Sequence, residues 1–279
     1  MKRLLTIEFQ KLWKNKASRV LILTYFIILS FIALMASIKF DLGFVKIHFA
    51  EMGIFNFPYI WHFNTYIASI FKLFLAIVIV SMMANEYSYG TLKQNLIDGL
   101  SKKEFIQSKV YMVFAFALLS TVYVFVMSLL LGFSFSSYNE IGIVFTDLEY
   151  LFAYFLKLVG FFSFCLFLGI LIKRSAFAIG FLLVWQIVES IAMGIMRWNF
   201  FEGTDMYIKV SNFFPLESMA NLIKEPFTRL NAVKSIETQL TQAEVIRDYS
   251  VDIQSVVVVS IWTLLFIYGS FKILQKRDL

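Results

Sequence analysis

The sequence predicts an all-α integral membrane protein with six transmembrane helices in a single transmembrane domain, residues 1–279. Hydrophobic residues make up 59% of the chain and charged residues only 16%, far from the composition of soluble proteins. Several apolar runs reach the roughly 20 residues that a helix needs to cross a bilayer. The basic residues gather beside these runs instead of forming one stripe, which argues against nucleic-acid binding and indicates membrane orientation.

The N-terminal segment 1–19 is predicted to form an amphipathic helix in the membrane interface. Its apolar residues follow helical i, i+4, i+7, i+8 spacing: Leu5, Phe9, Leu12 and Trp13. One apolar face can therefore lie in the membrane surface. A basic tail that only sets orientation is the alternative. A cleaved signal peptide over 20–36 is disfavoured, because the charged leader is unusually long and the run reaches spanning length.

Six spans follow from the apolar runs: 20–38, 65–84, 110–133, 150–172, 176–196 and 253–271. The clustered lysines and arginines of the segments 2–19, 93–109, 173–174 and 272–277 all fall on one side if both termini are inside. The loop after the third span carries Glu140, Asp147 and Glu149 and no basic residue, which suits the outside. We therefore expect a multi-pass protein of the cell (inner, cytoplasmic) membrane with both termini and the loop 85–109 in the cytoplasm.

The loop 85–109 contains two helix-start signals. Thr91 with Gln94 and Ser101 with Glu104 both fit the capping box, in which side chains satisfy backbone N–H groups at a helix start. Asp98-Gly99 reads as a helix end between them. This predicts a two-turn helix over 92–98, held between Gly90 and Gly99. Its exposed apolar residues would be Leu92, Leu96 and Ile97. A helix this short needs a partner to pack against.

The segment 197–251, expected on the extracytoplasmic side, is too long for a simple connection and predicts two amphipathic helices. The first would present one apolar face: Leu216, Met219, Leu222 and Ile223. The second would do the same: Val233, Ile236, Leu240 and Ala243. A surface excursion without stable helices is the alternative.

Three charged residues lie inside the predicted spans: Lys72, Lys157 and Glu189. Counting at the helical rise places both lysines ~10 Å from the outer face and Glu189 ~20 Å from the inner face of a core of ~30 Å. Charges at one depth are expected to pair, because a lone charge in the bilayer is costly. We expect an ion pair between Glu189 and one of the lysines; either lysine could instead extend outward to the interface.

Small residues recur four apart in the fifth predicted span, at Ala176 and Gly180 and again at Ser190 and Gly194. This spacing allows close approach of helix backbones, either between two copies of the chain or within one.

Searches for catalytic motifs find no phosphate-binding loop, no nucleophile elbow and no metal-binding His or Cys pattern. Cys165 is the only cysteine, so neither an intramolecular disulfide nor a cysteine-based metal site is expected. The chain is predicted to be no enzyme and to hold no catalytic residues, metal or cofactor of its own.

The pattern E-Y-S-Y-G-T-L-K-x-x-L-x-x-x-x-S-K-K-E-F-x-x-S-K, residues 86–109, resembles the first cytoplasmic loop of ABC transporter permeases of the type 2 exporter class. The agreement extends to the N-terminal helix, the six spans, the large outer segment and the basic C-terminal tail. Many members of the class have a proline before the Ser-basic pair, where this chain has Asp98-Gly99-Leu100.

This resemblance implies a membrane-spanning permease subunit that exports a hydrophobic or amphiphilic substrate. Two such subunits, as a homodimer or heterodimer, would combine with cytoplasmic ATPase subunits that bind the ATP and magnesium. The coupling helix that receives the ATPase movement would involve Glu86, Gly90, Thr91, Leu92, Leu96, Ile97, Ser101 and Lys102. Leu5, Phe9, Leu12 and Trp13 would belong to a gating helix that leads into the first span.

Other classes fit less well. An ion-coupled secondary transporter should show spans broken by Gly or Pro and an inverted repeat, and none of the three prolines lies within a predicted span. A membrane-embedded enzyme should place several polar catalytic groups at one depth. A membrane assembly or scaffold protein without transport activity is a further alternative. The aromatic-rich spans are compatible with lipids, amphiphilic drugs, antimicrobial peptides or lipid-linked glycans.

Overall fold

The computed structural model describes residues 2–38, 40–41, 46–47, 52–202, 204, 206–230 and 247–277. Within these residues the fold is helical apart from one two-stranded antiparallel ribbon, β1 (Phe40–Asp41) and β2 (Lys46–Ile47). Five helices are long and apolar enough to cross a membrane, and a bent pair adds a sixth span. The predicted all-α membrane class is confirmed, and the five helices and the bent pair correspond to the six predicted spans.

The spans of the first half lie close to their predicted positions. The helices of this half are α1 (Lys2–Lys14), α2 (Lys16–Ser37), α3 (Tyr59–Ile70), α4 (Lys72–Ser88), α5 (Thr91–Ile97), α6 (Lys102–Phe135) and α7 (Ile141–Val144). The second half contains α8 (Glu149–Ile172), α9 (Ser175–Ile195), the π-helical turn η1 (Met196–Phe200), α10 (Met206–Ser211), α11 (Pro215–Asn221), the 3-10 turn η2 (Phe227–Arg229) and α13 (Ile253–Lys276).

The second span departs from the prediction of one straight helix. It begins at Tyr59 and divides at Phe71 into α3 and α4, which meet at an angle of 46°. Thr65 Oγ1 donates to the carbonyl of Trp61 at 2.6 Å, and Ser69 Oγ donates to the carbonyl of Tyr66 at 2.8 Å. Hydroxyls that bond to carbonyls of the preceding turn bend helices. These two bonds precede the break at Phe71, which apolar run length alone does not predict.

The centre of the bundle is α8, which packs against α4, α6 and α13. At Gly169 a side chain would lie 3.1 Å from Cβ of Met83 and 3.2 Å from the carbonyl oxygen of Val80. Glycine thus lets α8 and α4 approach closely. Hydroxyls link α8 to two further spans, because Tyr154 Oη lies 2.7 Å from Tyr25 Oη of α2 and 2.8 Å from Ser120 Oγ of α6.

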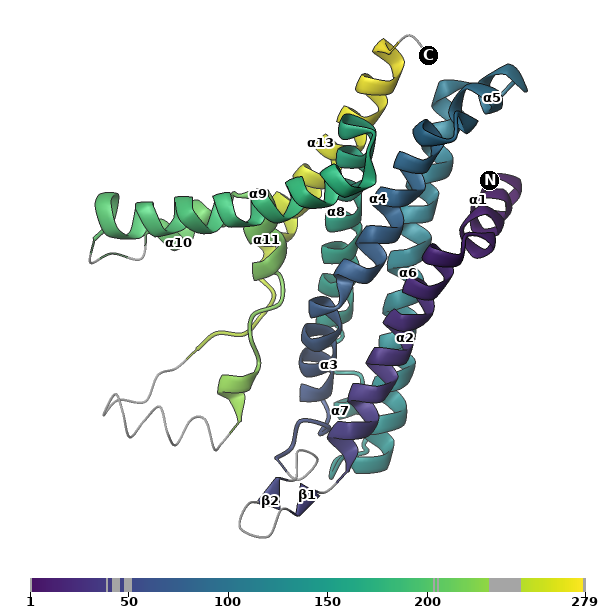
Figure 1. The fold of residues 1–279 in the computed structure, drawn as a ribbon. Helices are drawn as coiled ribbons and strands as arrows, with labels where there is room; N and C mark the ends of the chain where they lie inside the picture. The colour runs from purple at the N-terminus through teal and green to yellow at the C-terminus, as the bar shows by residue number, and fades with distance from the viewer. Residues whose placement is uncertain are drawn as a thin grey trace.

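The helix α9 extends away from this bundle. Figure 1 shows it running across the direction of α4, α6 and α8, with α10 beside it and α11 returning toward α13. Its described contacts within the chain are mainly with α4 and α8. Large apolar side chains along it remain exposed, among them Phe177, Val184, Ile187 and Ile191. The predicted span forms a helix, but the other described helices of the chain leave many of its apolar side chains exposed.

The outer segment contains the first of the two predicted helices. The residues of its expected apolar face are all buried: Leu216, Met219, Leu222 and Ile223. Three of these four lie in or directly after α11, which packs against α8, α9 and α13. The second predicted helix, with Val233, Ile236, Leu240 and Ala243, lies outside the described residues.

Figure 1 also shows that α1, α5 and the end of α13 lie at one end of the bundle, with the β-ribbon and α7 at the other. The N-terminal helix, the loop 85–109 and the C-terminal tail, which are far apart in sequence, therefore gather at the same end.

Candidate functional site

Four charged side chains meet at this end of the bundle, which we call the charge cluster: Glu8, Lys11, Glu86 and Lys109. Glu8 and Lys11 lie three residues apart on α1, so they share one face of that helix. Glu86 lies near the end of α4, and Lys109 lies in the third turn of α6. The cluster therefore joins three helices, and α5 connects two of them in the chain.

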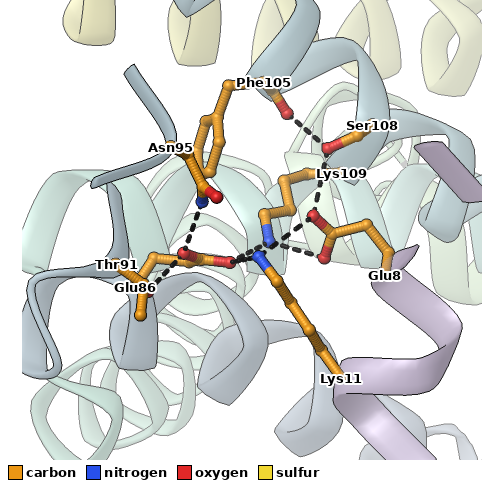
Figure 2. Close-up of polar contacts among 8 residues, drawn as sticks. All are labelled: Glu8, Lys11, Glu86, Thr91, Asn95, Phe105, Ser108 and Lys109. Carbon is orange, nitrogen blue, oxygen red and sulfur yellow. Dashed lines mark hydrogen bonds and ion pairs between the residues drawn. The ribbon is translucent and has the colours of Figure 1, made fainter. Parts of the chain in front are cut away.

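Lys109 is the centre of the charge cluster. Its Nζ donates to Glu8 Oε2 and to Glu86 Oε1, each at 2.6 Å (Figure 2). Lys109 has no exposed surface, and each carboxylate is 4% exposed. Lys11 Nζ donates to Glu86 Oε1 at 3.0 Å from the rim, with its side chain 39% exposed. Two ammonium groups thus face two carboxylates, which balances charges that would be costly to bury alone.

Neutral side chains also donate hydrogen bonds to the two carboxylates. Thr91 Oγ1 donates to Glu86 Oε2 at 2.5 Å, and Asn95 Nδ2 lies 3.3 Å from the same oxygen. Ser108 Oγ lies 3.3 Å from Glu8 Oε1. Because Thr91 and Asn95 are one turn apart on α5, the Glu86 carboxylate attaches that short helix directly to α4.

The two predicted capping boxes have different outcomes. Ser101 and Glu104 form theirs: Ser101 Oγ accepts from the Glu104 backbone at 3.2 Å, and the Glu104 carboxylate accepts from the Ser101 backbone at 3.0 Å. The box at Thr91 is wrong. Gly90 is the N-cap of α5, with a φ of 68°, so Thr91 is the first residue inside the helix and its hydroxyl donates to Glu86.

The helix α5 starts and ends one residue earlier than predicted, and Gly99, with a φ of 97°, follows it in the left-handed conformation expected at a helix end. Its apolar residues do not share one environment. Leu92 is buried in the core, which corrects the prediction that it is exposed. Leu96 is half-buried, whereas Ile97 is 84% exposed. The free apolar surface of α5 is therefore formed by Ile97 and Leu96, with exposed Tyr89 nearby in sequence.

The predicted gating residues divide between two sides of α1. Leu12 is buried and Leu5 packs partly against the core, so these two attach the helix to the bundle. Phe9 and Trp13 remain exposed, and their rings stack with centroids 6.2 Å apart. An amphipathic helix held in this way can present aromatic side chains to the membrane interface. Lys102, another predicted site residue, donates to carbonyls at the end of α13.

The expected ion pair inside the spans is not formed, which corrects the prediction for Lys72, Lys157 and Glu189. The Glu189 carboxylate accepts from the backbone N–H groups of Leu216 and Glu217, at 3.1 and 2.9 Å, and from Trp185 Nε1 at 2.6 Å. Lys157 Nζ donates to the carbonyl of Ala220 at 3.2 Å.

The physical reason is that α11 lies between these charges. Its N-terminal N–H groups face the carboxylate of Glu189 and its C-terminal carbonyl faces the ammonium of Lys157, as the helix dipole favours. Lys72 Nζ lies 4.5 Å from the centre of the Phe161 ring, a cation–π contact. Among the described residues, no ion pair joins Glu189 to either lysine.

Sequence reasoning did not single out Glu8, the counter-ion of Lys109. The signal was present, because Glu8 is the only acidic residue among the first nineteen. An acidic residue in a strongly basic segment of a membrane protein needs a specific partner. Which partner it has depends on how α1 packs on α6.

The fold and site together are those of a multi-pass membrane protein with up to six spans, an amphipathic helix before the first, and a short helix anchored between the second and third. Residues 4–189 match the family model described as ABC-2 family transporter protein. The chain belongs to this family, as the loop 85–109 predicted, and is therefore a permease subunit and not itself an ATPase. The match covers α1 through most of α9, including the whole charge cluster. A search of curated proteins finds no significant match.

The first prediction concerns the unequal importance of the two lysines in the charge cluster. Lys109→Met leaves two buried carboxylates without their shared partner and should cost about 3–5 kcal/mol of stability. Lys11→Met removes a half-exposed contact and should cost about 1 kcal/mol or less. Thermal unfolding of the purified proteins in detergent measures both. Equal losses in the two variants would contradict the central position of Lys109.

The second prediction distinguishes capping of α11 from the ion pair that the sequence suggested. Glu189→Leu leaves the N–H groups of Leu216 and Glu217 unsatisfied and should cost at least about 1–3 kcal/mol. Adding Lys157→Met should give no recovery, because the two side chains contact opposite ends of α11 and not each other. The thermal unfolding midpoints of the two single variants and the double variant test this. A double variant more stable than Glu189→Leu alone would restore the ion-pair interpretation.

Proposed function

We propose that this permease exports a hydrophobic or amphiphilic substrate, driven by a separate cytoplasmic ATPase subunit that binds ATP and Mg²⁺. The observation that carries the proposal is the buried contact of Lys109 with Glu8 and Glu86, supported by the family of the chain. Through it, α5 is attached to α4 and α6, and α1 is attached to both. A force applied to α5 by a docked ATPase therefore acts on the helix that leads into the first span.

The surface that would receive the ATPase is small and apolar. Leu96 and Ile97 lie at the exposed end of α5, and Tyr89 is exposed just before it. Apolar anchors on a short helix are suited to insertion in a groove of a soluble partner. Leu92 would have a different role from the one expected, since it packs α5 against the permease itself.

The substrate class is supported by a cavity of about 460 Å³ between α2, α3 and α6. Its walls are almost wholly apolar, and Asn64 and Tyr123 are the polar residues among those that line it. The size falls in the range of small-molecule sites, and the lining suits hydrocarbon or aromatic groups.

We further propose that the permease acts as a homodimer that uses α9. Gly180 and Gly194 have open space where a side chain would point: among the described residues, no atom beyond the adjacent helix backbone lies within 4 Å. Their small size therefore serves no packing within one subunit, which favours the intermolecular alternative. The exposed apolar side chains of α9 are consistent with a surface that a second copy covers.

One observation resembles an ion-coupled secondary transporter, because the second span is broken at Phe71. The ABC-2 family match places the chain in another class.

The third prediction tests the docking surface of α5. Ile97→Asp should release the ATPase from the permease, or uncouple ATP hydrolysis from transport, while membrane insertion stays normal because this side chain is already exposed. Leu96→Asp should act in the same direction. Ile141→Asp on α7 is the matched control, since it replaces an equally solvent-facing isoleucine at the other end of the bundle. Copurification with the tagged permease and ATPase activity are the measurements; normal values for both in Ile97→Asp would disprove the docking role.

The fourth prediction concerns the homodimer. In a Cys165→Ser background, a cysteine in place of Gly194 should form a crosslink between two copies of the chain in the membrane. A cysteine in place of Gly142 on α7, a position equally free of neighbours, is the control and should not crosslink. Denaturing electrophoresis without reductant measures the product. If no crosslink forms at Gly194 under any nucleotide condition, α9 is not the contact.

A further inference from the structure

Arg277, directly after α13, contacts the ends of two other helices. Its guanidinium donates to the carbonyls of Ile170 and Leu171 in the last turn of α8, at 3.0 Å for Leu171, and to Tyr87 Oη of α4 at 3.2 Å. Carbonyls in the last turn of a helix lack partners within the helix, and a positive charge there is favoured by the helix dipole. Arg277 therefore caps the C-terminal end of α8, although it lies more than 100 residues later in the chain.

A second cation caps the C-terminal end of α13 in the same way. Lys102, the second residue of the Ser-Lys pair that follows α5, donates to the carbonyl of Arg277 at 2.7 Å and lies 3.4 Å from that of Gln275. Lys102 at the start of α6 thus contacts the end of α13, and Arg277 after α13 contacts the end of α8. Lys102 is partly enclosed by this contact, so it is not a free side chain for an outside partner.

Tyr87 connects these contacts to the charge cluster. It is the neighbour of Glu86 on α4, and consecutive helical residues point about 100° apart. Glu86 faces α1, α5 and α6, whereas Tyr87 faces the end of α13, with Arg277 5.8 Å from its ring centre. Lys173, the residue that ends α8, also lies over this ring at 5.6 Å. The end of α4 is therefore a junction between two groups of helices.

This junction matters because α5 packs mainly on α4, and α1 mainly on α2 and α6. On the other side of the junction, α8 packs on α13 and α9 in addition to α4 and α6. The chain leaves α8 at Lys173, with a φ of 64°, and α9 begins at Ser175. Any displacement of the end of α8 is therefore passed to the start of α9 within two residues.

We propose that Arg277 is a positioning residue that transmits the ATP-driven movement of α5 and the start of α6 to α8, α9 and α13. This inference rests on the proposed function, because it assumes that an ATPase acts on α5. The route runs from Lys102 to the end of α13, and from Arg277 to the end of α8. Only arginine supplies several donors in a fixed fork, so lysine at this position can satisfy fewer of the three acceptors.

The test compares hydrogen exchange in the complete complex with its ATPase, without nucleotide and after trapping with ATP and vanadate. In the wild type, trapping should change amide exchange in 85–102 and also in 168–176, where α8 ends and α9 begins. In Arg277→Gln the change in 85–102 should remain, and the change in 168–176 should be lost. Arg277→Lys should retain part of it. Lys276→Gln is the matched control, because it removes an equal charge one residue earlier from an exposed side chain.

The outcomes separate three cases. A nucleotide-dependent change in 168–176 of Arg277→Gln that equals the wild type would overturn the inference and leave the proposed function intact. A wild-type complex that shows no nucleotide response, or no bound ATPase, would overturn the proposed function and this inference with it. Thermal unfolding of Arg277→Gln is measured alongside, and if the variant unfolds before analysis, Tyr87→Phe and Lys102→Gln, which each remove one contact of the route, must show the same selective loss.

Discussion

The burial of Lys109 is the constraint on which this end of the protein depends. An ammonium with no exposed surface needs full compensation, and it is found in two carboxylates at 2.6 Å from opposite sides. One carboxylate comes from α1 and the other from α4, so neither helix can move away from α6 without breaking one of the two charge contacts of Lys109. The same Glu86 carboxylate also receives Thr91 and Asn95 of α5. One desolvated cation thereby determines where α1, the short helix α5 and the helices α4 and α6 meet.

The same physical requirement explains where the other charges of this apolar chain lie. Backbone groups at helix ends carry partial charges and lack partners, and in a hydrophobic surrounding they need side chains to satisfy them. Glu189 and Lys157 hold the two ends of α11, and Lys102 and Arg277 hold the ends of α13 and α8. Charged residues that look isolated in the sequence thus act at helix ends, and they connect segments that the loops do not.

The helix α9 differs from the rest of the bundle because much of its apolar surface is not packed within one copy of the chain. The bundle around α8 is closed by close contacts such as Gly169 against α4, whereas α9 leaves it with open space at Gly180 and Gly194 and with apolar side chains exposed along its length. In a bilayer the lipid chains can cover such a surface, but they give no reason for glycine there. The proposed homodimer would supply such a reason, because a small residue lets a second helix approach closely.

The sequence by itself determined the membrane class, the six spans, the short helix between Gly90 and Gly99 and the ABC-2 family, because apolar run length, capping residues and the loop pattern are local features. It also identified Glu86, and the capping box at Ser101. Only the tertiary structure decided which charges meet. Thr91 fits a capping box locally, but α5 begins with Gly90 as its N-cap, and the Thr91 hydroxyl donates to Glu86. Leu92 lies on an apparently free helix, but α5 is turned so that this residue enters the core. Lys157 and Glu189 seemed matched in depth, but α11 folds between them. In each case the result depends on the position of a second element, which spacing along one helix does not contain.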